Sequence, residues 1–319
     1  MAENNPKLAR IRRITARQST VDWGASYVPA IFATPKEAPR TSRPVILKPA
    51  KFSLRDMHLM SEVEAGAALL ALHNPNVLDI HEQHMLSPAP AQHPLASHPS
   101  SVGKQFPRIE GTINVASRLG RLAWHGKVYS DRDHRWFPDI YVGDLLLFCT
   151  DDRGEYCVNW TIKGSHEDFD RPGSRLHGKP RSRDSARATF RHRLEAEYFA
   201  DAGIRTQRIV GGEIDVTLER NLEELFRYHS LPIGLSALMR EQIEDFLAKQ
   251  VGGANSAFTV LRDVSKQHHL SLEHARAVLY QAIWHRRLRV DLFYPLIIDK
   301  PLRAEGRDPL VVYASWFAR

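Results

Sequence analysis

The 319-residue sequence predicts an α/β protein in which a mixed sheet carries helices on its faces and a helical region follows. Helix-like and strand-like segments come in the order helix, strands, helix, strand between residues 60 and 214, which is typical of a sheet covered by helices. Beyond about residue 230, three amphipathic helix-like segments follow one another. We therefore divide the chain into a basic, proline-rich N-terminal arm (1–59), an α/β domain (60–228) and a C-terminal domain (229–319).

Composition is that of a soluble globular protein with a basic surplus. Lys and Arg number 44 against 37 Asp and Glu, a net charge of +7 that is compatible with a polyanionic partner. The two cysteines form no C-x-x-C motif, which excludes a disulfide framework or a zinc finger. No apolar run reaches the ~18 residues that a membrane span needs, and no secretory leader is recognisable. We expect a cytoplasmic protein that does not associate with membranes.

The first half of the α/β domain contains one clear helix and one clear strand. Ser61 is a predicted N-cap for an Ala- and Leu-rich helix that ends at Asn74-Pro75. The alternating segment 76–83, "NVLDIHEQ", then predicts a short strand. Residues 85–107 hold many prolines, serines and histidines, and we expect a long irregular loop there.

Strand signals dominate the next part of the chain, and a turn at 151–154 joins the last two of these strands. The segment 186–203 predicts a helix that ends at Gly203. The predicted strands are "IEGTINV" (109–115), "GKVYS" (126–130), "WFPDIYVGDLLLFCT" (136–150), "EYCVNWTIK" (155–163) and "IRTQRIVGGEI" (204–214).

The C-terminal domain shows three helix-like segments that each begin with serine, followed by two strand-like ones. The helices are expected at 236–249, 256–269 and 271–288, and the strands at 289–298 and 309–316. Three helices and a two-stranded hairpin are typical of a winged-helix domain. A helical protein-binding module explains the pattern equally well.

Three polar residues in the first half are candidates for a phosphodiester-cleaving site. Glu64 lies on the Ala-rich helix, Asp139 follows Pro138 at a predicted strand start, and Lys163 closes a strand. Cleaving a phosphodiester requires a hard cation on oxygen ligands, which Glu64 and Asp139 supply for Mg²⁺, with Mn²⁺ as a substitute. Lys163 then orients water or offsets transition-state charge. Each residue alone is typical of a solvated surface position, so their combination supports the prediction.

Thr161 is the departure from this pattern. The period of two places Asn159, Thr161 and Lys163 on one face of the strand. A second acid is expected two positions before the lysine, and a threonine hydroxyl ligates a metal only weakly. We therefore predict that Glu64 and Asp139 hold the metal with a minor contribution from Thr161.

Three segments resemble the TnsA endonuclease subunit of heteromeric, Tn-seven-like cut-and-paste transposases: "LMSEVEAGAALLALHNPNVLDIHEQ", "WFPDIYV" and "VNWTIKG". The resemblance covers roughly residues 22–230 and implies a restriction-endonuclease-like sheet in which Glu64, Asp139 and Lys163 are catalytic. It also implies a bacterial protein that nicks the 5′ strands of double-stranded transposon-end DNA. Its implied partners are an integrase-type, TnsB-like transposase and an ATP-dependent, TnsC-like regulator. Thr161 stands where that family carries glutamine.

Two other functions remain open at this stage. A catalytically inactive architectural subunit, which only binds DNA and partners, is suggested by Thr161. A stand-alone restriction-type nuclease is the other alternative.

A basic segment beside the predicted site is a candidate DNA contact, since each phosphate contact adds to binding and to its salt dependence. A solvated basic loop and helix face is the simpler alternative. The candidate DNA-binding residues are Arg175, Lys179, Arg181, Arg183, Arg187 and Arg191.

Overall fold

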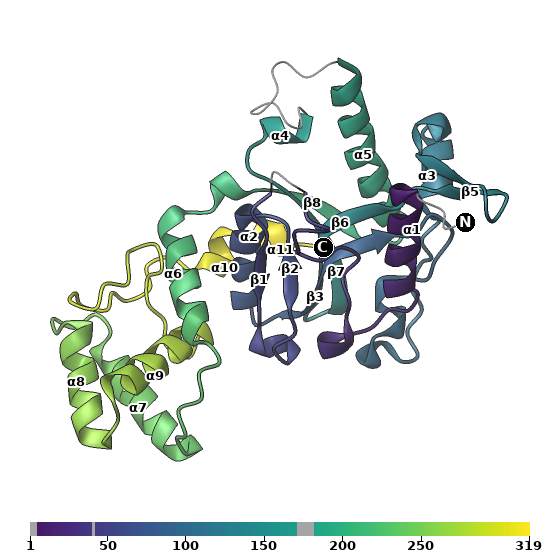
Figure 1. Cartoon of the computed structure of the whole chain (residues 1–319). Helices are drawn as coiled ribbons and strands as arrows, with labels where there is room; N and C mark the ends of the chain where they lie inside the picture. The colour runs from purple at the N-terminus through teal and green to yellow at the C-terminus, as the bar shows by residue number, and fades with distance from the viewer. Residues whose placement is uncertain (1–4, 40–41, 171–181) are drawn as a thin grey trace. The chain divides into compact units, whose positions relative to one another are not determined.

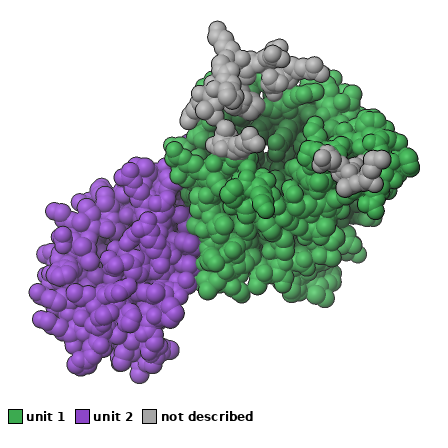
Figure 2. Space-filling model, in the orientation of Figure 1, with its two compact units in different colours: residues 1–67, 76–212, 317–319 green, residues 68–75, 213–316 purple. Residues whose placement is uncertain are grey.

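The computed structural model describes residues 5–39, 42–170 and 182–319, and the chain divides into two compact units. Figure 2 shows the first unit, which holds residues 1–67, 76–212 and 317–319, in green. The second unit, in purple, holds residues 68–75 and 213–316. The N-terminal 59 residues therefore belong to the same unit as the sheet, and the helix from residue 216 belongs to the second unit.

A four-stranded mixed sheet forms the centre of the first unit, as predicted (Figure 1). Its order is β3-β6-β7-β8, with β3 and β8 at the edges. The first three strands pair antiparallel, and β8 pairs parallel with β7. The strands are β3 (Val77–Leu86), β6 (Tyr141–Asp151), β7 (Gly154–Lys163) and β8 (Arg205–Val210).

One face of the sheet packs against α5 (Ser182–Ala200). Leu146, Phe148 and Cys157 of the sheet form a core with Phe190 and Leu194 of the helix. Because side chains alternate along a strand, Trp160 points to the other face of β7, where its ring lies 5.1 Å from that of Phe317. The prediction that Asn159, Thr161 and Lys163 share one face of this strand, opposite Trp160, is thus confirmed.

Helix α2 (Glu62–His73) begins where the sequence predicts it. The Ser61 hydroxyl accepts a hydrogen bond from the Glu64 N–H at 3.1 Å. The Glu64 carboxylate in turn accepts hydrogen bonds from the Ser61 hydroxyl and from the Met60 N–H. This reciprocal arrangement is close to a capping box, which satisfies helix N–H groups that lack an intrahelical partner.

The strand predicted at 109–115 is wrong, because α3 (Thr112–Arg118) forms there. Only Ile109 is extended, in an isolated bridge with Ala91. Gly111 has a φ of 89°, and a Cβ there would come within 2.5 Å of the Ala89 carbonyl carbon. This left-handed residue ends the extended backbone and starts the helix. The loop before it is irregular, as predicted, with two short 3-10 helices.

Smaller elements complete the first unit. The predicted strand at 136–150 is divided, because β5 pairs with β4 in a separate hairpin before β6 begins. The remaining elements are α1 (Pro6–Arg17), β1 (Val45–Leu47), β2 (Met57–Leu59), β4 (Lys127–Ser130), β5 (Arg135–Pro138) and α4 (Glu167–Asp170).

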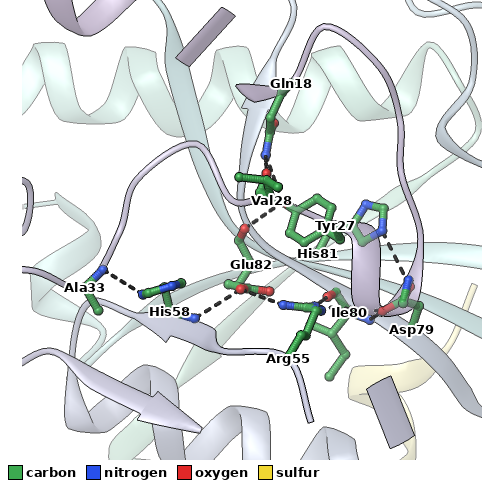
Figure 3. Close-up of polar contacts among 11 residues, drawn as sticks. Gln18, Tyr27, Val28, Ala33, Arg55, His58, Asp79, Ile80, His81 and Glu82 are labelled. Carbon is green, nitrogen blue, oxygen red and sulfur yellow. Dashed lines mark hydrogen bonds and ion pairs between the residues drawn. The ribbon is translucent and has the colours of Figure 1, made fainter. Parts of the chain in front are cut away.

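The N-terminal segment is folded onto the edge strand β3 through a buried polar network (Figure 3). The Arg55 guanidinium donates to the Glu82 carboxylate at 2.8 Å, and the His58 N–H donates to the same oxygen at 3.0 Å. The Tyr27 hydroxyl donates to the Glu82 carbonyl at 2.7 Å. Arg55 and Glu82 are almost fully removed from water, so each charge depends on the other for its compensation.

The second unit is helical. The three predicted helices are confirmed, and Ser236, Ser256 and Ser271 cap them through their hydroxyl oxygens. Its α-helices are α6 (Val216–Tyr228), α7 (Ala237–Gln250), α8 (Ala257–His268), α9 (Leu272–Trp284), α10 (Pro309–Val312) and the start of α11 (Ala314–Phe317).

The two strands predicted after these helices are wrong. Residues 289–298 make only an isolated bridge between Val290 and Ala304, and Asn221 of α6 holds this segment by donating to the Leu292 and Tyr294 carbonyls. Asp308 caps a helix that starts with Pro309, where strand was expected. Across the described residues, no helix is long and apolar enough to cross a membrane.

We predict that Arg55→Met destabilises the protein by about 3–5 kcal/mol, because it leaves the Glu82 carboxylate buried without its counter-charge. Urea unfolding followed by intrinsic fluorescence measures the change. Arg43→Met is the matched control, since the Arg43 side chain is 83% exposed beside Glu62 and its loss is expected to cost under about 1 kcal/mol. Equal effects of the two substitutions would contradict the role assigned to the buried pair.

Candidate active site

Glu64 is a buried carboxylate on the first turn of α2. It accepts hydrogen bonds from the Met60 N–H at 2.8 Å and from the Gln83 side-chain amide at 3.1 Å. Gln83 belongs to β3 and has a φ of 48°, the left-handed region that non-glycine residues rarely adopt. Such strained residues concentrate at functional sites. The strained backbone of Gln83 is therefore one indication of a functional site at this end of β3.

Asp144 lies on β6 directly beside the candidate lysine. Its Oδ2 accepts the Ile162 N–H at 2.7 Å and lies 3.3 Å from the Lys163 Nζ. The register of β3 and β6 places Gln83 opposite Asp144, because Glu82 pairs with Leu145 and His84 with Gly143. Strands β3, β6 and β7 thus bring Gln83, Asp144 and Lys163 to one part of the sheet, next to Glu64.

The two carboxylates influence each other's ionisation. The pKa of Glu64 is raised to about 7, mainly by burial and next by the negative charge of Asp144, whose effect is larger than the opposing effect of Lys163. Burial also opposes ionisation of Asp144, but the Lys163 ammonium and the Ile162 N–H outweigh it and lower the pKa of Asp144. At neutral pH, Asp144 is ionised while Glu64 is near its midpoint.

A pocket of ≈ 320 Å³ opens between this part of the sheet and α5. Asp144, Thr161 and Lys163 line its sheet side. The helix contributes basic and acidic side chains at successive turns, and the lining residues from α5 are Arg187, Ala188, Arg191, His192 and Glu195. The pocket therefore offers carboxylates and cations together, as a site for a phosphate and a metal ion requires.

Asp139 does not lie with Glu64 and Lys163, which corrects the predicted trio. Its Oδ1 lies 3.4 Å from the Arg10 guanidinium, and its N–H donates to the Gly126 carbonyl at 2.7 Å. Asp139 lies elsewhere because β5 ends at Pro138, so that Asp139 is in the short segment that connects the β4–β5 hairpin to β6. Five residues further along the same run, Asp144 takes the place expected for Asp139.

Thr161 lines the pocket as predicted, but its hydroxyl brings no charge to it. Among the predicted DNA contacts, Arg187 and Arg191 line the same pocket. Arg191 also donates to the Val142 carbonyl at 3.2 Å. The remaining four candidates cannot be placed at the site. Arg175, Lys179 and Arg181 lie outside the described residues, and at Arg183 only the helical backbone is described.

Sequence reasoning missed Asp144, Gln83 and Glu195. Asp144 had a visible signal, because it is the only charged residue in the apolar run from Ile140 to Thr150. Glu195 is buried on α5, where its carboxylate accepts a hydrogen bond from the Asn159 amide at 2.9 Å. Nothing in the local sequence separates Glu195 from Glu197, which lies on the same helix and is only half-buried.

The described residues hold no group of three or more His, Cys, Asp and Glu side chains placed to bind a metal ion. Mg²⁺ does not require such a cage, because it commonly binds one or two carboxylates and completes its shell with water and substrate phosphate. Glu64 and Asp144 fit that requirement. Burial is the main cause of the raised pKa of Glu64 and repulsion from Asp144 adds to it, and a dication between the two carboxylates would relieve that repulsion.

Comparisons with known proteins add no family to this description. No protein-family model matches the chain, and no curated protein matches it. The resemblance to TnsA therefore rests on the sequence motifs alone.

We predict that Glu195→Gln stabilises the protein at pH 8 and not at pH 4. Burial, with the charge of Asp144, raises the pKa of Glu195 to about 7. Folding therefore loses about 3 kcal/mol at this residue as pH rises from about 4.5, where the unfolded chain ionises, to about 7. Glutamine keeps the acceptor for Asn159 and removes this loss. Thermal unfolding between pH 4 and 8 measures it.

Glu197→Gln is the control for this measurement, because Glu197 lies about half a turn away on the same helix and its side chain is 41% exposed. We expect its stability difference from wild type to stay under about 0.5 kcal/mol. A flat pH dependence for the Glu195→Gln difference would show that Glu195 is not held protonated by burial.

Proposed function

We propose that the first unit is a Mg²⁺-dependent DNA endonuclease of restriction-endonuclease-like fold that hydrolyses phosphodiester bonds. The observation that carries this proposal is the contact between Asp144 and Lys163 beside the buried Glu64. Two electrostatically coupled carboxylates and a lysine, on three adjacent elements, are what such chemistry uses. The arginines of α5 across the pocket favour a phosphate-bearing substrate.

Each residue has a role that follows from its surroundings. Glu64 and Asp144 would hold Mg²⁺, which when bound polarises the phosphate and lowers the pKa of the attacking water. Gln83 fixes the Glu64 carboxylate by donating to it. Lys163, positioned by Asp144 and by the Ile162 carbonyl at 2.7 Å, would place positive charge beside the phosphate oxygens that carry negative charge in the transition state.

The arginines on α5 would bind the DNA backbone. Arg187 and Arg191 are one helical turn apart, so their side chains lie on the same face of α5. Both line the pocket that holds Lys163. Contacts of this kind give affinity without sequence selectivity, and they make binding sensitive to salt.

The narrower function follows from the motif resemblance to TnsA. We propose that the protein nicks the 5′ strands at double-stranded transposon ends while an integrase-type, TnsB-like transposase cuts the 3′ strands. An ATP-dependent, TnsC-like regulator would be a further partner, and the cytoplasm of a bacterium the setting. For the second unit, which keeps the predicted helices α7, α8 and α9 but not the wing strands, we propose a DNA- or partner-binding role.

Thr161 favours a second candidate, an architectural subunit without catalytic activity. Its hydroxyl stands in the pocket where related nucleases carry an acid or amide, so the site has one good metal ligand fewer. Such a subunit would bind transposon ends and partner proteins through the same surfaces. Strand cleavage separates the two candidates.

We predict that Asp144→Asn reduces 5′-strand nicking at least 100-fold, because it removes a carboxylate that would hold the metal ion and that positions Lys163. Purified protein is incubated with the transposase partner, Mg²⁺ and an end-labelled transposon end, and products are resolved on a denaturing gel. Asp139→Asn is the matched control, an identical substitution five residues away, and is expected to nick within about threefold of wild type.

The opposite ranking of the two variants would return the catalytic role to Asp139. Absence of nicking by the wild-type protein, with DNA binding intact, would support the architectural subunit. Nicking of DNA by the isolated chain, without any partner, would support a stand-alone nuclease instead.

A further inference from the structure

A second pocket, unconnected with the carboxylates, lies beside the β4–β5 hairpin. Its volume is ≈ 520 Å³, and its walls are mainly apolar, with Leu122, Trp136 and Pro138 among them. Lys127 is the cation of the lining, and its Nζ lies 4.7 Å from the centre of the Trp136 ring. We call this pocket and the adjoining rings of Trp124 and Tyr129 the aromatic pocket.

The hairpin register explains why these rings face outward. Tyr129 pairs with Trp136, so both lie on the same face, with ring centres 5.2 Å apart. The next pair, Val128 and Phe137, lies on the opposite face and packs against α1 through Ile14. One face of the hairpin is therefore covered by the N-terminal helix, while on the other face Trp136 remains 57% exposed.

Exposed aromatic rings of this size mark binding surfaces, because leaving them in water forgoes their burial energy. The charge around the pocket favours a polyanion as the occupant. Arg121, Lys127 and Arg132 are exposed and form no ion pair with any carboxylate in the part of the chain that the structure describes. Of the two acids in the hairpin turn, Asp133 is already paired with Arg12.

Exposed aromatic rings beside unpaired cations are what proteins use to bind single-stranded nucleic acid. An unpaired base offers a free π-face to Trp136, and its phosphate offers an anion to Lys127 or Arg121. Bases within a duplex are stacked on both faces, so they have no face left for an aromatic ring. The aromatic pocket therefore suits an unpaired nucleotide and not an intact duplex.

The pocket lies close to the candidate active site along the chain. Pro138 lines the aromatic pocket, and Val142 lines the site with Asp144. Val142 is four residues beyond Pro138, a span of at most about 13 Å at the ~3.3 Å rise of a strand. That span matches a few nucleotides of DNA backbone.

We propose that the aromatic pocket binds an unpaired nucleotide of the DNA strand next to the cleavage position, with Trp136 as the stacking platform and Lys127 as the phosphate contact. The inference rests on the proposed function, in that it takes DNA as the substrate. It adds that the protein holds locally melted DNA and not only duplex.

The test is binding of a fluorescein-labelled 12-nucleotide oligothymidine to the full-length protein, measured by anisotropy in EDTA so that no cleavage occurs. Trp136→Ala should weaken binding at least fivefold, as expected for the loss of one stacked base. Trp136→Phe should restore most of the affinity. Binding of a blunt 12-base-pair duplex should change less than twofold in either variant.

Tyr294→Ala is the matched control, because Tyr294 is an exposed ring (45%) with the Arg303 guanidinium 4.0 Å from its centre, but lies in the second unit. It should leave oligothymidine binding unchanged. The proposal is overturned if Trp136→Ala binds the oligonucleotide like wild type, which would leave the surface to a protein partner, or if duplex binding falls equally.

The two proposals fail separately. Lys163→Ala removes a group from the active site and should abolish nicking, while Trp136→Ala should still weaken oligothymidine binding at least fivefold in that background. Normal nicking by Lys163→Ala, together with weak binding by Trp136→Ala, would reject the endonuclease site and leave the nucleotide pocket standing.

Discussion

The buried ion pair between Arg55 and Glu82 is the constraint on which the rest of the first unit depends. It lies on β3, an edge strand whose outer backbone groups would otherwise face water. The N-terminal segment covers that edge: the Ala30 N–H donates to the Gln83 carbonyl at 2.9 Å, and the Met85 N–H donates to the Gln18 side chain at 2.6 Å. The ion pair fixes the covering segment in place.

Strand β3 also connects the covering N-terminal segment to the candidate site. Gln83 follows Glu82 directly, and its left-handed backbone costs on the order of 1 kcal/mol. Its carbonyl is held by the N-terminal segment and its amide by Glu64, so both neighbours stabilise the strained conformation. We infer that removing the N-terminal segment would disturb Glu64 as well as the sheet edge, although the segment itself carries no reactive group at the site.

Features set by local sequence were predictable. Ser61 and the three serines of the second unit cap helices because a hydroxyl at that position satisfies N–H groups in any context. The facing of Asn159, Thr161 and Lys163 followed from strand periodicity alone. Glu64 and Lys163 were therefore placed correctly in relation to their own elements.

Features set by tertiary context were not predictable. The predicted strand breaks at Asp139 and Ile140, so that one continuous strand-like run becomes a hairpin strand and a sheet strand, and Asp144, not Asp139, is the carboxylate beside the lysine. Residues 309–316 are apolar and β-branched in part, yet Asp308 and Pro309 start a helix there. Gly111 turns another predicted strand into a helix through its positive φ.

The proposed chemistry requires Glu64 and Asp144 to share one divalent cation beside Lys163. Anomalous scattering from Mn²⁺ in crystals of the Lys163→Ala variant bound to transposon-end DNA locates that cation. We expect an anomalous peak within coordination distance, about 2.0–2.3 Å, of carboxylate oxygens of both Glu64 and Asp144. A peak at Asp139, or no peak near either carboxylate at saturating Mn²⁺, would contradict this shared site.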